Sequence, residues 1–298
     1  MSASGIELSK FGLSSPPTSG YRYDSRLVAC PRVSCIRSNS IKLLQRSCRV
    51  KVFCSSQRKE VRIVRGSSMN EVYDELAMQV LSTATIEANS HSKFIVGLAG
   101  PPGAGKSTVA AEVVQRVNKL WPDKTSSFME TNSTEVAVVL PMDGFHLYRS
   151  QLDAMEDPEE AHARRGAPWT FTPDLLLKCL HKLRDEGFAS APSFSHSIGD
   201  PIEDDILVSI HHRVIIVEGN YLLLDDTIWQ DISSIFDQRW FIEVDIDTSM
   251  QRVLSRHIST GKAPDMAKWR IEYNDRPNAE LIMASKKNAE LIIHSVDI

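Results

Sequence analysis

A glycine-rich stretch that ends in a lysine and two hydroxyl residues is the part of this chain best suited to chemistry. It consists of Gly100, Pro101, Pro102, Gly103, Ala104, Gly105, Lys106, Ser107 and Thr108 and matches G-x-x-x-x-G-K-[ST] in full. Glycines let such a loop turn so that its backbone N–H groups point at phosphate oxygens. The lysine reaches the terminal phosphates, and the hydroxyl of Ser107 ligates Mg²⁺. The stretch therefore predicts a site for a nucleoside triphosphate with Mg²⁺.

A glutamate at the end of a later apolar run is the second candidate. Val214–Val217 is followed by Glu218 and Gly219. An apolar strand that ends in an acid is the Walker B pattern, whose carboxylate holds Mg²⁺ directly or through water. The alternative is an acid that only faces solvent at a strand end. The position of Glu218 after the glycine-rich stretch, a P-loop by its motif, favours the metal-binding interpretation.

An aspartate that closely follows another apolar run is the third candidate. Asp143 comes after Val136–Leu140, so it lies at the carboxyl end of a strand, where doubly wound sheets bind their ligands. A carboxylate there can take the proton of an attacking hydroxyl, as the catalytic-base acid of kinases does. Two alternatives stay open, an acid in the Mg²⁺ shell and a turn aspartate before Gly144. His146 is weaker evidence, because a histidine near such a turn is as often structural.

Two arginines and a tryptophan form a compact group that suits an acceptor site. Arg164, Arg165 and Trp169 can grip an anionic or ring-bearing molecule. The alternative is that Trp169 packs at the edge of the core while the arginines are solvated.

The elements that must position these residues alternate between strand and helix. Apolar runs without alternation, typical of strands buried on both faces, occupy Phe94–Ala99, Val136–Leu140, Val214–Val217 and Trp240–Val244. Helical patterns occupy about 70–90, 106–120, 174–186 and 263–273, and another begins near residue 249. Asn70 is a candidate N-cap, Pro173 suits a first helical turn, and Gly187 ends the segment after it. This alternation predicts a doubly wound α/β fold with a parallel sheet.

Charge is distributed unevenly along the 298 residues. Residues 1–59 carry eleven Lys or Arg and two acids, whereas the remainder carries 23 basic and 36 acidic residues, a net charge of −13. An acidic body of this kind repels the backbone of nucleic acids, so we expect no nucleic-acid partner. No apolar run approaches the roughly 20 residues of a membrane-spanning helix, so we expect no membrane role. Beyond residue 59 only Cys179 remains, which excludes a disulfide framework there.

The basic segment 1–59 predicts an organelle transit peptide, followed by one domain over residues 60–298. It contains thirteen serines, scattered arginines and almost no acids. Its first residues and Val52–Ser55 resemble plant chloroplast presequences, so we expect a chloroplast location. A mitochondrial presequence is the nearer competitor, and an ordinary disordered basic tail is the plainer alternative.

Three of these segments together resemble a known family. The P-loop, the tetrapeptide Asp143–His146 and the pair Glu218–Gly219 are similar to those of the phosphoribulokinase/uridine kinase family, which also includes bacterial-type pantothenate kinase. Met142–Leu147, Arg164–Phe171 and Asp200–Pro201 most resemble a branch labelled uridine kinase-like or fructose-transport-type kinase. The resemblance covers about residues 90–295.

This resemblance implies a P-loop fold with a five-stranded parallel sheet, helices on both faces and a small helical lid. It implies a kinase that uses ATP and Mg²⁺ to phosphorylate an alcohol hydroxyl of a small molecule. Asp143 then occupies the place of the general base, and Glu218 matches the acid of the Glu-Gly pair. Arg252 and Arg256 resemble lid arginines that embrace the transferred phosphate, and their i, i+4 spacing places both on one helix face. A solvated helix face is the alternative for this pair.

The identity of the acceptor stays open between nucleoside-, sugar- and pantothenate-like molecules. His196 lies where uridine kinases carry a Tyr-Asp-Phe…His segment, but the tyrosine and aspartate of that segment are absent here. A regulatory or scaffolding nucleotide-binding protein is the alternative function. A GTPase would need Asn-Lys-x-Asp, and Asn118-Lys119 is followed by Leu120-Trp121 instead. The sequence leaves a monomer and a homo-oligomer equally open.

Overall fold

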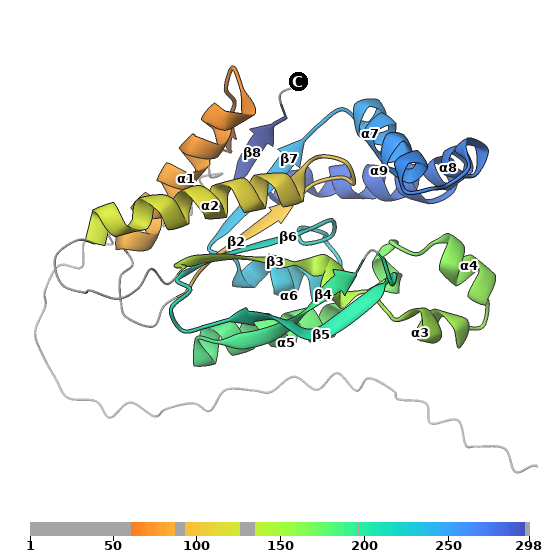
Figure 1. The fold of residues 1–298 in the computed structure, drawn as a ribbon, viewed down its shortest axis with the longest axis horizontal. Helices are drawn as coiled ribbons and strands as arrows, with labels where there is room; N and C mark the ends of the chain where they lie inside the picture. The colour runs from red at the N-terminus through yellow and green to blue at the C-terminus, as the bar shows by residue number, and fades with distance from the viewer. Residues whose placement is uncertain (1–60, 87–92, 126–134, 196, 296–298) are drawn as a thin grey trace, which may run out of the picture. The chain divides into compact units, whose positions relative to one another are not determined.

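The computed structural model describes residues 61–86, 93–125, 135–195 and 197–295 (Figure 1). The expected transit peptide and His196 lie outside these residues. Within them, six parallel strands form the central sheet in the order β1-β8-β7-β2-β6-β3. Their bounds are β1 Arg62–Val64, β2 Phe94–Ala99, β3 Ala137–Pro141, β6 Val214–Gly219, β7 Gln238–Glu243 and β8 Leu291–His294.

The register of the inner strands aligns their carboxyl ends. Ala99 of β2 is paired with Gly219 of β6, and Pro141 of β3 is paired with Glu218. Every residue of β2 and β6 is buried, as expected for strands covered on both faces. The P-loop, Asp143 and Glu218 therefore meet at one edge of the sheet.

Helices cover both faces of the sheet and create two cores. Helices α1 (Met69–Ile86) and α2 (Lys106–Thr125) lie on one face, and α5 (Pro173–Glu186) and α6 (Thr227–Ile235) lie on the other (Figure 1). Alternate residues of each strand point to opposite cores, so Val96 packs in the first and Ile95 in the second.

Smaller elements surround the carboxyl edge. The lid helices are α7 (Ile246–Ser259), α8 (Pro264–Arg270), the π-helix η3 (Ile271–Asp275) and α9 (Arg276–Ala284). Opposite them lie η1 (Met142–Phe145), α3 (Arg149–Asp153), α4 (Pro158–Ala163) and η2 (Pro168–Thr170) (Figure 1). An antiparallel hairpin joins β4 (Ala189–Ser195) to β5 (Asp200–Val208), and η4 (Ser285–Asn288) precedes β8.

The expected α/β class is confirmed, but the expected number of five strands is wrong by one. The additional strand β1 has three residues and pairs with β8 at the sheet edge, so it is too short to give a sequence pattern. The expected N-cap is also wrong, because α1 begins at Met69 and Asn70 lies inside it, while the Ser68 hydroxyl accepts the Glu71 N–H. The expected limits of α5 are confirmed, with Gly187 in the left-handed conformation at its end. Among the described residues, no helix combines the length and apolarity needed to cross a bilayer.

Candidate active site

The P-loop joins β2 to α2 and depends on glycine at two positions. Gly103 and Gly105 have φ angles of 81° and 90°, which favour glycine. A Cβ on Gly103 would lie 2.8 Å from the Ser249 carbonyl oxygen, so α7 packs directly against the loop. The backbone N–H groups of the loop and of the first turn of α2 form the type of cradle that holds phosphates.

Lys106 is buried at the start of α2, with 9% of its surface exposed. Its ammonium donates to the carbonyl oxygens of Gly100 (2.9 Å) and Pro101 (3.0 Å). Burial lowers the pKa of Lys106, and the carboxylates of Glu218 and Asp143 oppose that shift. The guanidinium of Arg256, on α7, adds to the lowering of this pKa. Arg256 therefore lies within electrostatic range of the lysine.

Glu218 ends β6 beside Ser107, and the Ser107 hydroxyl donates to Glu218 Oε1 at 2.9 Å. Burial raises the pKa of Glu218, the Lys106 ammonium opposes this, and Asp143 adds to the rise. Mg²⁺ prefers oxygen ligands and usually binds one or two protein groups together with phosphate oxygens. The hydroxyl of Ser107 and the carboxylate of Glu218 fit that requirement.

Asp143 lies in η1, directly after β3, and its charge acts on both Lys106 and Glu218. The structure therefore brings Asp143 together with the P-loop lysine and the strand-end glutamate. Its own backbone carbonyl accepts the His146 N–H at 3.2 Å and lies 2.8 Å from His146 Nδ1.

Two glycines that follow the acids allow close contacts around Asp143. A Cβ on Gly144 would lie 1.9 Å from the carbonyl oxygen of Pro192 in β4. A Cβ on Gly219 would lie 2.5 Å from Cβ of Met142. The turn that carries Asp143 is thus packed tightly between the hairpin and β6. The sequence showed both glycines but not these contacts, because the partner segments are distant along the chain.

Aromatic rings surround His146, which follows the Asp143 turn. The His146 ring centroid lies 3.9 Å from that of Phe171 and 4.8 Å from that of Phe194. Phe171 in turn contacts Tyr221, with an interplanar angle of 76°. Sequence reasoning missed these three aromatic residues, and no local spacing linked them. Trp169 is 48% exposed in η2, so it does not pack into the core edge.

The two predicted lid arginines lie on α7 as expected. Arg252 Nη1 donates to the Gly103 carbonyl at 3.3 Å, so this side chain contacts the P-loop. Arg256 acts on Lys106, as described above. Arg252 is therefore directed toward the P-loop, whereas Arg256 is exposed on the same helix.

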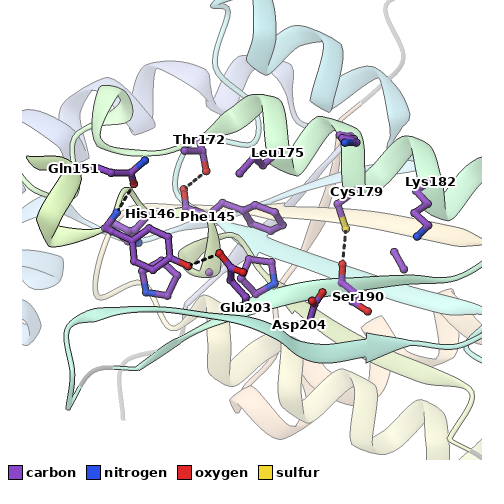
Figure 2. Close-up of a pocket in the computed structure, with 16 residues that line it drawn as sticks. Phe145, His146, Gln151, Thr172, Leu175, Cys179, Lys182, Ser190, Glu203 and Asp204 are labelled. Carbon is purple, nitrogen blue, oxygen red and sulfur yellow. Dashed lines mark hydrogen bonds between the residues drawn. The ribbon is translucent and has the colours of Figure 1, made fainter.

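A cavity of about 390 Å³ lies behind η1, between α5 and the hairpin (Figure 2). Phe145 and His146 form part of its wall, and Leu175, Cys179 and Glu203 line it from the two neighbouring elements. Burial raises the pKa of the Cys179 thiol to about 11, so the thiol stays protonated at neutral pH. Neither Asp143 nor the P-loop lines this cavity, which is therefore separate from the phosphate end of the site.

Comparison with known proteins agrees with the nucleotide-binding geometry of the P-loop, Lys106 and Glu218. Residues 95–298 match the model of the Phosphoribulokinase / Uridine kinase family. A Schizosaccharomyces pombe protein named "Putative uridine kinase C227.14" is 35% identical over 230 residues, which cover 75% of this chain and 91% of that protein. The "ATP-dependent kinase-like protein notR'" of Aspergillus versicolor is 40% identical over 152 residues, 49% of this chain and 88% of that protein.

Solved structures support the fold. The crystal structure titled as a putative fructose transport system kinase from Silicibacter sp. TM1040 has a TM-score of 0.61 and 30% identity, and covers 73% of this chain and 98% of its own. YFH7 of Saccharomyces cerevisiae has a TM-score of 0.63 at 21% identity, covering 78% and 99%, and is similar in fold. The chain therefore belongs to the phosphoribulokinase/uridine kinase family and is an ATP-dependent phosphotransferase with an alcohol group as acceptor.

Proposed function

We propose that this protein transfers the γ-phosphoryl group of ATP to an alcohol hydroxyl of a small nucleoside-, sugar- or pantothenate-like metabolite, with Asp143 as the base. The observation that carries this proposal is the position of Asp143 at the end of β3. Its charge acts on Lys106 and Glu218 across the same sheet edge. A carboxylate there lies opposite the phosphate cradle, where an acceptor hydroxyl has to enter.

In this mechanism the P-loop N–H groups and Lys106 bind the β- and γ-phosphates. Ser107 and Glu218 would hold Mg²⁺, which neutralises charge on the phosphate oxygens when bound. Asp143 orients the acceptor hydroxyl and takes its proton as the new O–P bond forms and the bond from the γ-phosphorus to the bridging oxygen breaks, releasing ADP. Arg252 and Arg256 supply positive charge from α7. Phosphoryl transfer needs little more from a protein than such positioning and electrostatics.

The acceptor side favours a molecule with a ring or another planar face. His146 and Phe194 are half-buried next to the Asp143 turn, with their ring centroids 4.8 Å apart, and Phe171 is buried against His146. His146, Trp169 and His196 are the residues we propose for direct contact with the acceptor, while the Arg165 guanidinium bonds Leu147 and Asp200. Relatives named for uridine kinase and fructose transport make nucleosides and hexoses the first acceptors to test.

A metabolite screen tests the reaction class. ATP turnover is measured with Mg²⁺ alone and with nucleosides, hexoses, pantothenate, ribulose 5-phosphate and glycerate. We expect turnover to need one of these acceptors and to yield its phosphate ester, because Asp143 has no substrate hydroxyl to activate without it. Equal hydrolysis of ATP with and without every acceptor would instead support a regulatory or scaffolding nucleotide-binding protein.

Asp143→Asn tests the role of the base with the acceptor found in that screen. The amide keeps the shape but not the charge, so we expect kcat to fall by about 10²–10⁴-fold. We expect the Kd of ATP to change by less than about threefold, since the P-loop contacts are untouched. Asp231→Asn, at an exposed position of α6, is the matched control and keeps its kcat. A collapse of ATP binding would place Asp143 in the Mg²⁺ shell, and no change in either quantity would make it a turn aspartate.

A further inference from the structure

Arg165 lies in the loop between α4 and η2 and contacts elements from both ends of the site. Its side chain is 14% exposed. Its guanidinium donates hydrogen bonds to one set of partners, and its backbone carbonyl accepts hydrogen bonds from another. This arrangement is unlike that of a surface arginine held by one ion pair.

The guanidinium of Arg165 binds the acceptor end. Its Nη2 donates to the Leu147 carbonyl at 2.9 Å and to Asp200 Oδ1, at the start of β5, at 3.1 Å. The same Asp200 oxygen accepts the Arg149 N–H at 2.8 Å. The guanidinium carbon also lies 5.6 Å from the centre of the Phe194 ring in β4. One side chain therefore ties the hairpin to the segment that follows Asp143.

The backbone carbonyl of Arg165 binds the lid helices. It accepts from Arg270 Nη2 at 3.0 Å and from Asn274 Nδ2 at 3.1 Å. Asn274 is 1% exposed, and its own oxygen accepts from Asn278 Nδ2 at 3.0 Å. Asn274 lies in the π-helix η3. This conformation is rare in proteins overall, but where it occurs it is often at a functional site. The lid is thus fixed to the Arg165 loop by buried polar groups.

The lid helices in turn contact the P-loop. His257 Nε2 of α7 lies 2.8 Å from Asp275 Oδ2 of η3. At the other end of α7, the Ser249 hydroxyl donates to the Pro102 carbonyl, and Arg252 contacts Gly103. A continuous series of polar contacts therefore runs from the P-loop through α7 and η3 to Arg165 and the hairpin.

We propose that Arg165 is a positioning residue that couples nucleotide binding at the P-loop to ordering of the acceptor hairpin β4–β5. This inference rests on the proposed function, since it needs a nucleotide at the P-loop. A ligand shifts a distant element only if it favours one arrangement of the elements between them, and Arg165 holds the lid and the hairpin in one joint arrangement. Lysine cannot replace it fully, because an ammonium lacks the planar guanidinium, whose Nη2 bonds two acceptors while its carbon lies 5.6 Å from the centre of the Phe194 ring.

The test needs no acceptor. Amide hydrogen exchange is measured with and without Mg²⁺ and the ATP analogue AMP-PNP, whose Kd is determined by calorimetry. In the wild type we expect exchange over residues 189–195 and 200–208 to slow by about fivefold, at the low end of typical coupling between sites. In Arg165→Gln we expect a change below about 1.5-fold there, with Arg165→Lys between the two. Because coupling is reciprocal, the Kd of AMP-PNP in these variants should rise by no more than about the same fivefold.

Two further variants separate coupling from loss of stability. Asn274→Ser removes a donor to the Arg165 carbonyl but leaves the guanidinium, and we expect it to weaken hairpin protection as well. The double variant should lose little more than either single one, because both act in one series of contacts. Arg239→Gln is the matched control. It breaks the 2.9 Å ion pair between Arg239 of β7 and Glu290, whose side chains are 28% and 22% exposed, and keeps the nucleotide-dependent protection.

The outcomes differ for the two proposals. AMP-PNP binding without hairpin protection in the wild type overturns the coupling role, and so does equal protection in folded Arg165→Gln and Asn274→Ser. Additive losses in the double variant also overturn it. Failure of the wild type to bind AMP-PNP overturns the proposed function itself, together with this inference.

Discussion

At the scale of single residues, the site holds opposite charges that burial disfavours. Burial lowers the pKa of Lys106 and raises that of Glu218, while each group opposes the shift of the other. Removing one partner of such a pair leaves an uncompensated buried charge. The pair is therefore kept for its function, since fixed charges stabilise a transferring phosphoryl group without reorganisation during the reaction.

The raised pKa of Glu218 predicts a pH-dependent affinity for Mg²⁺. Protons compete with the metal for the carboxylate, so affinity falls as pH falls toward a pKa that lies above the ordinary 4.5. Below that pKa the apparent Kd of Mg²⁺ should rise by about tenfold per pH unit. Calorimetric titration of the AMP-PNP complex measures it. The Glu218→Gln variant should bind Mg²⁺ weakly, and its apparent Kd should vary with pH only through the titration of the nucleotide itself. If the Kd of Mg²⁺ varied equally with pH in both proteins, Glu218 would not be a ligand of the metal.

Residues with local signals could be predicted from the sequence, and residues defined by distant contacts could not. Lys106, Ser107 and Glu218 follow buried strands or begin a helix, so motif and register together place them at one edge. The aromatic contacts of His146 with Phe171 and Phe194 depend on three separate segments. The hydrophobic pattern of one segment does not show which aromatic side chains of other segments it will contact.

At the scale of elements, the contact between η1 and the hairpin decides where Asp143 lies. The hairpin has an irregular register between Ala191 and Ser193, opposite a β5 residue, Asp204, with a φ of 53°. Such a bulge bends a strand and re-aims its side chains. Here it accompanies the close approach of Pro192 to Gly144. The sequence did not predict this hairpin, because Pro192 and Pro201 interrupt the alternation on which a strand prediction depends.

Gly144→Ala tests this contact. A methyl group 1.9 Å from the Pro192 carbonyl forces η1 and β4 apart and displaces Asp143. Because small misplacements of catalytic groups are costly, we expect kcat to fall by about 10²-fold while the Kd of AMP-PNP stays within about threefold. Steady-state kinetics and calorimetry measure the two effects.

Gly187→Ala is the control for backbone strain. Its φ of 75° penalises alanine, but its Cβ would meet only Lys93 at an ordinary 3.7 Å, far along α5 from Asp143. We expect a lower melting temperature and an unchanged kcat. If both variants lowered the melting temperature and neither lowered kcat, the Gly144 contact would stabilise the fold without positioning Asp143.

At the scale of the whole molecule, charge separates residues 1–59 from the rest, with a net charge of +9 against −13. The P-loop, Asp143, Glu218 and the two arginines of α7 all belong to the acidic part of the sequence. This division is consistent with a targeting segment that has no part in catalysis. A basic, serine-rich segment would suit an import receptor, and an acidic body with a local cluster of cations would suit a small anionic nucleotide.

We therefore propose that residues 1–59 direct the protein into chloroplasts and are then removed. A fusion of residues 1–60 to a fluorescent reporter should enter plastids of a plant cell, and the native protein should begin near residues 54–60 by N-terminal sequencing. Residues 60–298 should match the full chain in melting temperature and in the Kd of AMP-PNP, because this part contains the P-loop and every residue proposed for the site. Replacing the arginines of 1–59 by glutamine is the control and should leave the reporter in the cytosol. Mitochondrial import would favour the competing presequence, and a native chain that begins at Met1 or Ser2 would reduce the segment to a basic tail.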